Sequence, residues 1–233
     1  MNILVTGASK GIGRKIADEL KNSGNLFVCA RNEDLLKTIS AKEYCVCDLA
    51  GDLTVLAKFI QKNEIDVLIN NAGEYIYGGI ETMTKEQIEH IFKVNVTAPA
   101  YLSSQAVPLM KKNKWGRIIN IGSISGVMGE ANASLYSSTK AGLIGMTKSL
   151  ALELAQDNIT VNTINPGWVD TELGEKSIEE SEFTREEILD CIPQKRFVSP
   201  DEIASLVKYL ISDGARGITG QSINICAGLS VGI

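Results

Sequence analysis

Tyr136 and Lys140 stand four residues apart within the segment YSSTK, early in a long helical pattern. Residues at this spacing share one face of a helix, so the lysine ammonium would lie near the tyrosine phenol. A free tyrosine has a pKa near ~10 and is a poor acid or base at neutral pH, whereas a nearby cation favours the phenolate and lowers that pKa. The pair therefore suits acid–base chemistry, although an amphipathic helix with a surface lysine has the same spacing.

A glycine-rich turn, TGASKGIG at residues 6–13, directly follows the first apolar run of the chain. Glycines at such a turn let the backbone approach a pyrophosphate, which then lies at the N-terminus of the next helix. The spacing is G-x-x-x-G-x-G, which differs from the G-x-G-x-x-G of the usual dinucleotide fingerprint. The turn indicates a nucleotide site, but the nucleoside of a methyl donor, or a turn without any ligand, fits the same pattern.

Histidine and cysteine are too few or too scattered for two other kinds of chemistry. His90 is the one histidine of the sequence, which nearly excludes Ser-His-Asp and Cys-His catalysis. Cys45 and Cys47 could form half of a metal site, but no second cysteine pair and no histidine lies near them in the sequence. We therefore expect reduced, buried thiols and no metal ion.

The composition is that of a globular protein with a modest acidic excess. The 233 residues are 44% hydrophobic and 22% charged, and the net charge is −5. This charge argues against nucleic acid as a partner, because phosphate binding needs a basic surface. No apolar run reaches the ~20 residues of a membrane-spanning helix, and the N-terminus lacks the pattern of a secretion signal. We expect a cytoplasmic protein that binds neither nucleic acid nor a membrane.

Short runs rich in Val, Ile and Leu alternate with longer helical patterns along the chain. Most of these runs are apolar on both sides, as buried parallel strands are, and the alternation implies right-handed crossovers. The expected strands are 2–6, 26–30, 43–47, 66–70, 116–122, 159–165 and 222–225. The expected helices are 12–22, 33–40, 53–63, 85–94, 99–112, 135–156 and 200–212. The pattern predicts an α/β fold with a doubly wound parallel sheet of about seven strands, in a single domain over residues 1–233.

Residues 171–196 are highly charged and interrupt this alternation after the sixth expected strand. The segment is either a solvated helical insertion or a mobile lid over a substrate site, because ligands bind beyond the carboxyl ends of parallel strands. A substrate pocket would also take residues from 125–130 and 168–170.

Four further short motifs lie next to expected strands or helices: Asn70-Asn71-Ala72-Gly73, Asn95, Ser123 and Pro166-Gly167. Together with the glycine turn and the tyrosine–lysine pair, they resemble the motif set of the single-domain short-chain dehydrogenase/reductase family. The resemblance covers nearly the whole chain, in the right order. Within that family the chain is most similar to the 3-oxoacyl-[acyl-carrier-protein] reductases, at residues 116–121, 140–145 and 218–221.

This resemblance implies a three-layer α/β/α Rossmann fold and an NADP-dependent oxidoreductase that transfers a hydride between NADPH and a carbonyl substrate, a 3-oxoacyl thioester in the most similar members. Tyr136 would exchange a proton with the substrate oxygen, and Lys140 would lower the phenol pKa and hold the nicotinamide ribose. Ser123 would polarise the carbonyl, and Asn95 would anchor a water for proton relay. Another small ketone or alcohol as substrate, or a nucleotide-sensing protein on the same fold, are the alternatives.

The cofactor site follows from the glycine turn and from the resemblance. The expected cofactor-binding residues are Gly7, Ser9, Lys10, Gly11, Ile12, Gly13, Arg31, Asp48, Leu49, Asn71, Ala72, Gly73, Tyr136, Lys140, Pro166, Gly167, Val169 and Thr171. NAD-specific proteins place an acidic residue at the end of the second strand, where this chain has Arg31. Arg31 and Lys10 would therefore converge on a 2′-phosphate, and we expect NADP(H) as the cofactor.

Two further expectations concern macromolecular partners. The similar reductases dock an acidic carrier protein through two basic positions, which correspond here to Lys114 and to the acidic Asp157. The resemblance also implies a homotetramer or homodimer that assembles through helices 99–112 and 135–156.

Overall fold

The structure, a computed structural model, describes residues 1–181 and 183–231; Glu182, which falls in the segment 171–196, and residues 232–233 lie outside it. In the described part, seven strands form one parallel sheet in the order β3-β2-β1-β4-β5-β6-β7. The strands are β1 (Asn2–Thr6), β2 (Asn25–Ala30), β3 (Glu43–Val46), β4 (Val67–Asn70), β5 (Gly116–Ile121), β6 (Ile159–Pro166) and β7 (Ser222–Ile225). Since β1 pairs with both β2 and β4, the sheet is doubly wound, and the predicted fold class is confirmed.

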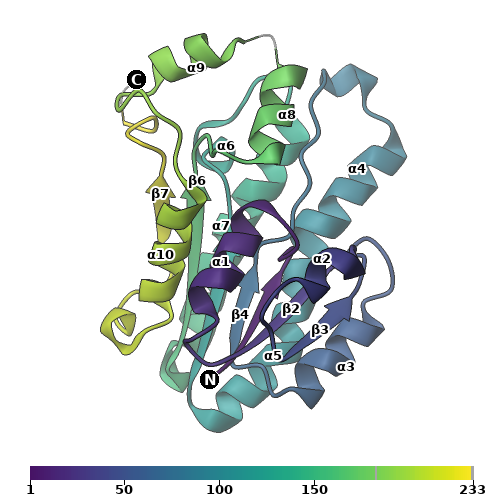
Figure 1. The fold of residues 1–233 in the computed structure, drawn as a ribbon, viewed down its shortest axis with the longest axis vertical. Coiled ribbons are helices and arrows are strands. Elements are labelled where there is room, and N and C mark those ends of the chain that lie inside the picture. The colour runs from purple at the N-terminus through teal and green to yellow at the C-terminus, as the bar shows by residue number, and fades with distance from the viewer. Residues whose placement is uncertain (182, 232–233) are drawn as a thin grey trace.

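Helices cover both faces of the sheet and make a three-layer structure (Figure 1). One face carries α1 (Gly11–Leu20), α2 (Glu33–Lys37) and α10 (Pro200–Leu210), and the other carries α3 (Thr54–Lys62), α5 (Ala98–Asn113) and α7 (Ser134–Leu154). Because side chains alternate along a strand, Ile3 and Val5 of β1 pack into the first core and Leu4 packs into the second. Among the described helices, none is both long and apolar enough to cross a membrane.

The ends of the predicted strands and helices lie within three residues of the observed ones. The helices expected at 85–94 and 99–112 differ most from the prediction. They are joined, because α4 (Lys85–Phe92) continues through a π-helical turn (Lys93–Thr97) into α5. Such wider turns are frequent at functional sites, and this one contains Asn95.

The charged segment 171–196 folds mainly into α8 (Glu172–Glu180) and α9 (Arg185–Cys191). The side chain of Thr171 caps α8 by accepting a hydrogen bond from the Gly174 N–H at 3.1 Å. Arg185 on α9 pairs with Asp170 at 2.6 Å and also with Glu175 of α8. These contacts tie both helices to the chain that leaves β6, beyond the carboxyl end of that strand (Figure 1).

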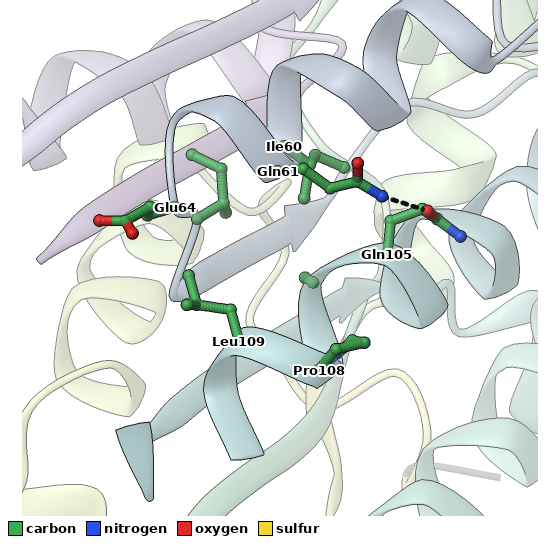
Figure 2. Close-up of a pocket in the computed structure, with 8 residues that line it drawn as sticks. Ile60, Gln61, Glu64, Gln105, Pro108 and Leu109 are labelled. Atoms are coloured by element: carbon green, nitrogen blue, oxygen red, sulfur yellow. Dashed lines mark hydrogen bonds between the residues drawn. The ribbon is translucent and has the colours of Figure 1, made fainter. Parts of the chain in front are cut away.

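A small surface hollow of about 190 Å³ lies between α3 and α5 (Figure 2). Gln61 Nε2 donates a hydrogen bond to Gln105 Oε1 at 2.9 Å beside apolar side chains that include Ile60 and Leu109. The residues that line this hollow are not among the expected site residues.

Candidate active site

The expected site residues come mostly from the carboxyl ends of four neighbouring strands. The glycine turn follows β1, the Asn71–Gly73 segment follows β4, Ser123 follows β5, and Pro166 ends β6. Because β1, β4, β5 and β6 are consecutive in a parallel sheet, these four strand ends meet at one edge. That edge is where the strand order reverses, which is the usual ligand position in open α/β sheets.

Lys140 lies in the second turn of α7 and is only 4% exposed. Its Nζ donates a hydrogen bond to the carbonyl oxygen of Ile121, at the end of β5, at a distance of 2.9 Å. The same Nζ lies 5.6 Å from the centre of the Tyr136 ring, so the spacing in the sequence places both residues on one helix face. Burial disfavours the ammonium and lowers the pKa of Lys140 to about 8.

The pKa of the Tyr136 phenol differs from the expected one. Burial raises its pKa to about 12, the Glu130 carboxylate adds to this increase, and a hydrogen bond from Ser123 partly opposes it. The expected lowering of the phenol pKa by Lys140 is therefore wrong for this structure. The physical reason is that the ammonium binds the Ile121 carbonyl, while desolvation of the phenolate dominates at Tyr136.

Ser123 lies between β5 and the short helix α6 (Ser125–Met128) and is 9% exposed. Its Oγ accepts a hydrogen bond from the Ser125 backbone N–H at 3.2 Å and lies 3.1 Å from Ser125 Oγ. These two contacts hold the hydroxyl at the same sheet edge as Lys140.

Asn95 is almost fully buried in the π-helical turn. Its Nδ2 donates to the Glu74 carbonyl at 2.9 Å and to Thr139 Oγ1 at 3.1 Å, and its Oδ1 accepts from the Glu74 N–H at 2.9 Å. One lone pair of Oδ1 is left for a further partner. A Cβ on Gly73 would lie 3.2 Å from Lys140 Nζ and 3.4 Å from this Oδ1. Because Gly73 has no side chain, the space between Lys140 Nζ and Asn95 Oδ1 stays open.

The glycine turn has the shape that a pyrophosphate requires. Gly7 and Gly11 have φ values of +66° and +57°, which favour glycine. A Cβ on Gly13 would lie 2.3 Å from the carbonyl oxygen of Gly7, so a larger residue does not fit there. Asn71 Nδ2 fastens the turn from the β4 side through hydrogen bonds to Thr6 O and Gly7 O, at 2.9 and 3.2 Å. No side chain caps the N-terminus of α1, so its backbone N–H groups are available for an anion. The glycine turn and the start of α1 therefore fit the pyrophosphate of a dinucleotide.

Both expected phosphate-binding cations are paired with carboxylates. Arg31 Nη1 lies 2.9 Å from Glu74 Oε1, and the second oxygen of Glu74 lies 2.6 Å from His90 Nε2. Lys10 Nζ lies 2.8 Å from Glu172 Oε2 at the start of α8. The structure therefore does not bring the two cations onto a common partner, and the sequence reasoning had assigned no role to Glu74 or Glu172.

The remaining expected cofactor residues lie in the two cores, at the end of β6 and just after it, in the glycine turn, and after β3. The side chains of Leu49 and Val169 are buried in the two cores, so a nucleotide could meet only their backbone atoms. Pro166 ends β6, Gly167 and Thr171 follow it, and Ser9 and Ile12 belong to the glycine turn and the start of α1. Asp48 closes the turn after β3 by accepting a hydrogen bond from the Ala50 N–H at 3.0 Å.

Tyr75 and Glu130 are neighbours of the site that were not singled out as functional residues. The Tyr75 ring meets the Tyr136 ring edge-on, with centres 4.9 Å apart. Tyr75 Oη donates to Glu130 Oε1 at 2.7 Å. Glu130 lies within the segment 125–130 that the sequence associates with a substrate pocket, but no local spacing connects it to Tyr75.

Comparisons with known proteins agree with this arrangement. A family model described as Enoyl-(Acyl carrier protein) reductase matches residues 7–230. The 3-oxoacyl-[acyl-carrier-protein] reductase FabG of Buchnera aphidicola subsp. Schizaphis graminum is 37% identical, over 97% of this chain and 96% of that protein. A crystal structure of an actinorhodin polyketide ketoreductase variant with NADPH has a TM-score of 0.92 at 35% identity and covers 99% of this chain and 97% of its own.

A second solved relative is YwfH, an NADPH dependent reductase involved in bacilysin biosynthesis. It superposes with a TM-score of 0.93 at 32% identity, over 100% of this chain and 99% of its own. Both the full-length match and the assembly of the family's motifs at one sheet edge lead to the same assignment. The protein belongs to the short-chain dehydrogenase/reductase family of oxidoreductases.

Proposed function

We propose that the protein is an NADPH-dependent reductase that converts the carbonyl of a 3-oxoacyl thioester to an alcohol. The observation that carries the proposal is the pairing of half-buried Tyr136 with buried Lys140 beside the glycine turn, at the edge where the strand order reverses. The names of the relatives support the substrate class and the cofactor. Another small ketone is the alternative substrate.

When bound, NADPH would supply the hydride for the carbonyl carbon. Tyr136 then donates its proton to the carbonyl oxygen. A pKa raised to about 12 keeps the phenol protonated at neutral pH, which is the form that a proton donor needs. Ser123 donates a hydrogen bond to the oxygen while negative charge develops on it.

Lys140 and Asn95 serve the return of the proton. The Lys140 Nζ lies 5.6 Å from the centre of the Tyr136 ring, where it would return a proton to the phenolate that remains after proton donation. Its lowered pKa of about 8 eases the passing of a proton to that phenolate. The free lone pair of Asn95 Oδ1 is suited to hold a water that resupplies Lys140 across Gly73.

Several residues would hold the cofactor. Gly7, Gly11 and Gly13 would admit the pyrophosphate to the N-terminus of α1. Arg31 and Lys10 would bind the 2′-phosphate after exchanging their present carboxylate partners for it. Asp48 would accept from the adenine edge, and Lys140 would bind the nicotinamide ribose. The helices α8 and α9 would act as the substrate lid.

The charge near Asp157 supports a small thioester rather than a carrier protein as the main substrate. Asp157 pairs with Lys114 and lies 3.9 Å from Lys111, so the basic groups that would meet an acidic partner are neutralised. We further propose a homotetramer or homodimer that assembles through α5 and α7, where Tyr101 and Leu152 are exposed. The five free thiols agree with the cytoplasm as its location.

The test is NADPH consumption by the purified protein with acetoacetyl thioesters, small ketones, quinones and sugars. The proposal predicts turnover with an acetoacetyl thioester and its loss in the Tyr136→Phe variant. NADPH binding without consumption on any carbonyl compound would instead support a nucleotide-sensing protein.

A further inference from the structure

A chain of three hydrogen bonds links Ser123 to Tyr75 through a carboxylate. Ser123 Oγ lies 3.1 Å from Ser125 Oγ, Ser125 Oγ lies 2.6 Å from Glu130 Oε2, and Glu130 Oε1 lies 2.7 Å from Tyr75 Oη. The members come from the end of β5, from α6 and the chain after it, and from the loop after β4. These hydrogen bonds therefore connect two loops that are far apart in the sequence.

The carboxylate sets the direction of each hydrogen bond. An ionised carboxylate only accepts, so the hydroxyls of Ser125 and Tyr75 both donate to Glu130. The proton of Ser125 is then committed, so its Oγ accepts from Ser123, and Ser123 exchanges this bond for one to the substrate oxygen when it donates to the carbonyl. Since the Ser125 N–H also donates to Ser123 Oγ at 3.2 Å, the oxygen of Ser123 is held from two sides.

Through Tyr75, Glu130 is also connected to Tyr136, the proposed proton donor. Tyr75, which donates to Glu130, packs edge-on against the Tyr136 ring with an interplanar angle of 75°. Ser123 and Ser125 are 9% and 7% exposed, so water competes little for the serine arm. Hydrogen bonds to a charged acceptor in such shielded surroundings are stronger than neutral ones.

We propose that Glu130 is a positioning residue for carbonyl reduction, which holds Ser123 through Ser125 and the Tyr136 ring through Tyr75. The proposal rests on the proposed function, because it assigns Glu130 to the groups that act on the carbonyl oxygen. Glu130 itself touches neither Ser123 nor Tyr136 through a hydrogen bond in the structure, so its effect passes through its two partners.

A double-mutant cycle tests the serine arm. Glu130→Gln keeps the shape but replaces the charged acceptor, and we expect kcat to fall about tenfold while the affinity for NADPH, measured by its fluorescence, stays unchanged. Ser125→Ala removes the link to Ser123. In that background the loss caused by Glu130→Gln should shrink at least about threefold, because coupled residues are not additive. Equal losses in both backgrounds, or a parallel loss of NADPH affinity, would overturn the proposal.

The pH profile separates the charge of Glu130 from its hydrogen bonds. The charged and titratable groups around the Tyr136 phenol are Glu130, Lys140 and Tyr75, and the Glu130 charge raises the phenol pKa. Glu130→Gln should therefore move the alkaline limit of reduction to lower pH. Tyr75→Phe keeps the carboxylate, and should lower kcat without moving that limit. A limit that stays in place in Glu130→Gln would contradict the proposal.

Two controls complete the design. Glu86→Gln removes an exposed carboxylate of α4 and should change neither kcat nor the pH limit. The Ser125–Glu130 cycle is also measured as the free energy of unfolding in urea, which needs no turnover. Absence of coupling there would count against the hydrogen-bond chain itself, whereas coupling in a protein that reduces no carbonyl would count against the proposed function alone.

Discussion

Replacing the buried Lys140 with methionine should make the protein more stable and inactive at the same time. Burial lowers the pKa of Lys140 from its ordinary 10.5 to about 8, which corresponds to about 3 kcal/mol of cost for keeping the ammonium in the folded protein below pH 8. Methionine has a similar length and no charge, so Lys140→Met removes this cost. The lost hydrogen bond to the Ile121 carbonyl offsets about 1 kcal/mol, which leaves a net gain of about 2 kcal/mol at pH 7.

The pH dependence of this gain identifies its cause. Between the folded pKa of about 8 and the unfolded value of 10.5, the unfolded lysine binds a proton that the folded lysine does not. The stability of the wild type therefore rises with pH in this window relative to the variant, and levels off above it. The advantage of Lys140→Met should be largest below pH 8 and disappear toward pH 10.5.

Urea denaturation of both proteins at several pH values between 7 and 10.5 measures the difference directly. NADPH turnover by the variant should be lost, because in the proposed mechanism the ammonium also returns a proton to Tyr136 and binds the ribose. A variant that is less stable than the wild type at pH 7, or a difference that does not change with pH, would refute the reasoning about the buried ammonium.

Three other substitutions test separate parts of the site. Tyr136→Phe should lower kcat at least about 100-fold and leave NADPH affinity nearly intact, because only the proton donor is removed; retention of a tenth of the activity would exclude its role. The wild type should prefer NADPH over NADH by about tenfold, and Arg31→Asp should erase or reverse this preference, as measured by kcat/KM with each cofactor; equal wild-type values would exclude a phosphate contact. Asp157→Arg should improve the use of an acidic carrier-protein substrate and make it more sensitive to salt, whereas a strong wild-type preference for the carrier-bound form would contradict the neutralised surface around Lys114.

The fold and the position of the candidate site residues could be predicted because they depend on local patterns and on topology. Tyr136 and Lys140 share a helix face at their spacing, and consecutive parallel strands bring the glycine turn and Ser123 to one edge. The strand alternation was sufficient for the order of the elements. It could not predict the π-helical turn at Asn95, since the widening depends on packing around that residue.

The ion pairs of Lys10 and Arg31 and the pKa of Tyr136 depend on tertiary contacts that cannot be read from the spacing of residues in the sequence. Lys10 meets Glu172 across 162 residues of sequence, and Arg31 meets Glu74 across 43 residues. The raised pKa of Tyr136 follows from how deeply the folded chain buries the phenol, which the four-residue spacing to Lys140 does not reveal. Glu130 was missed for the same reason, because its partner Tyr75 lies 55 residues away in the sequence.

Deuterium labelling of the cofactor shows directly whether this protein transfers a hydride from NADPH to the carbonyl carbon of the substrate. The protein is given acetoacetyl thioester and NADPH that carries deuterium at both hydrogens of the reactive nicotinamide carbon, and the product is analysed by mass spectrometry and NMR. We expect a 3-hydroxyacyl thioester with one deuterium on the former carbonyl carbon, and no such product with Tyr136→Phe. A product without deuterium at that carbon, or the same yield from Tyr136→Phe, would contradict this expectation.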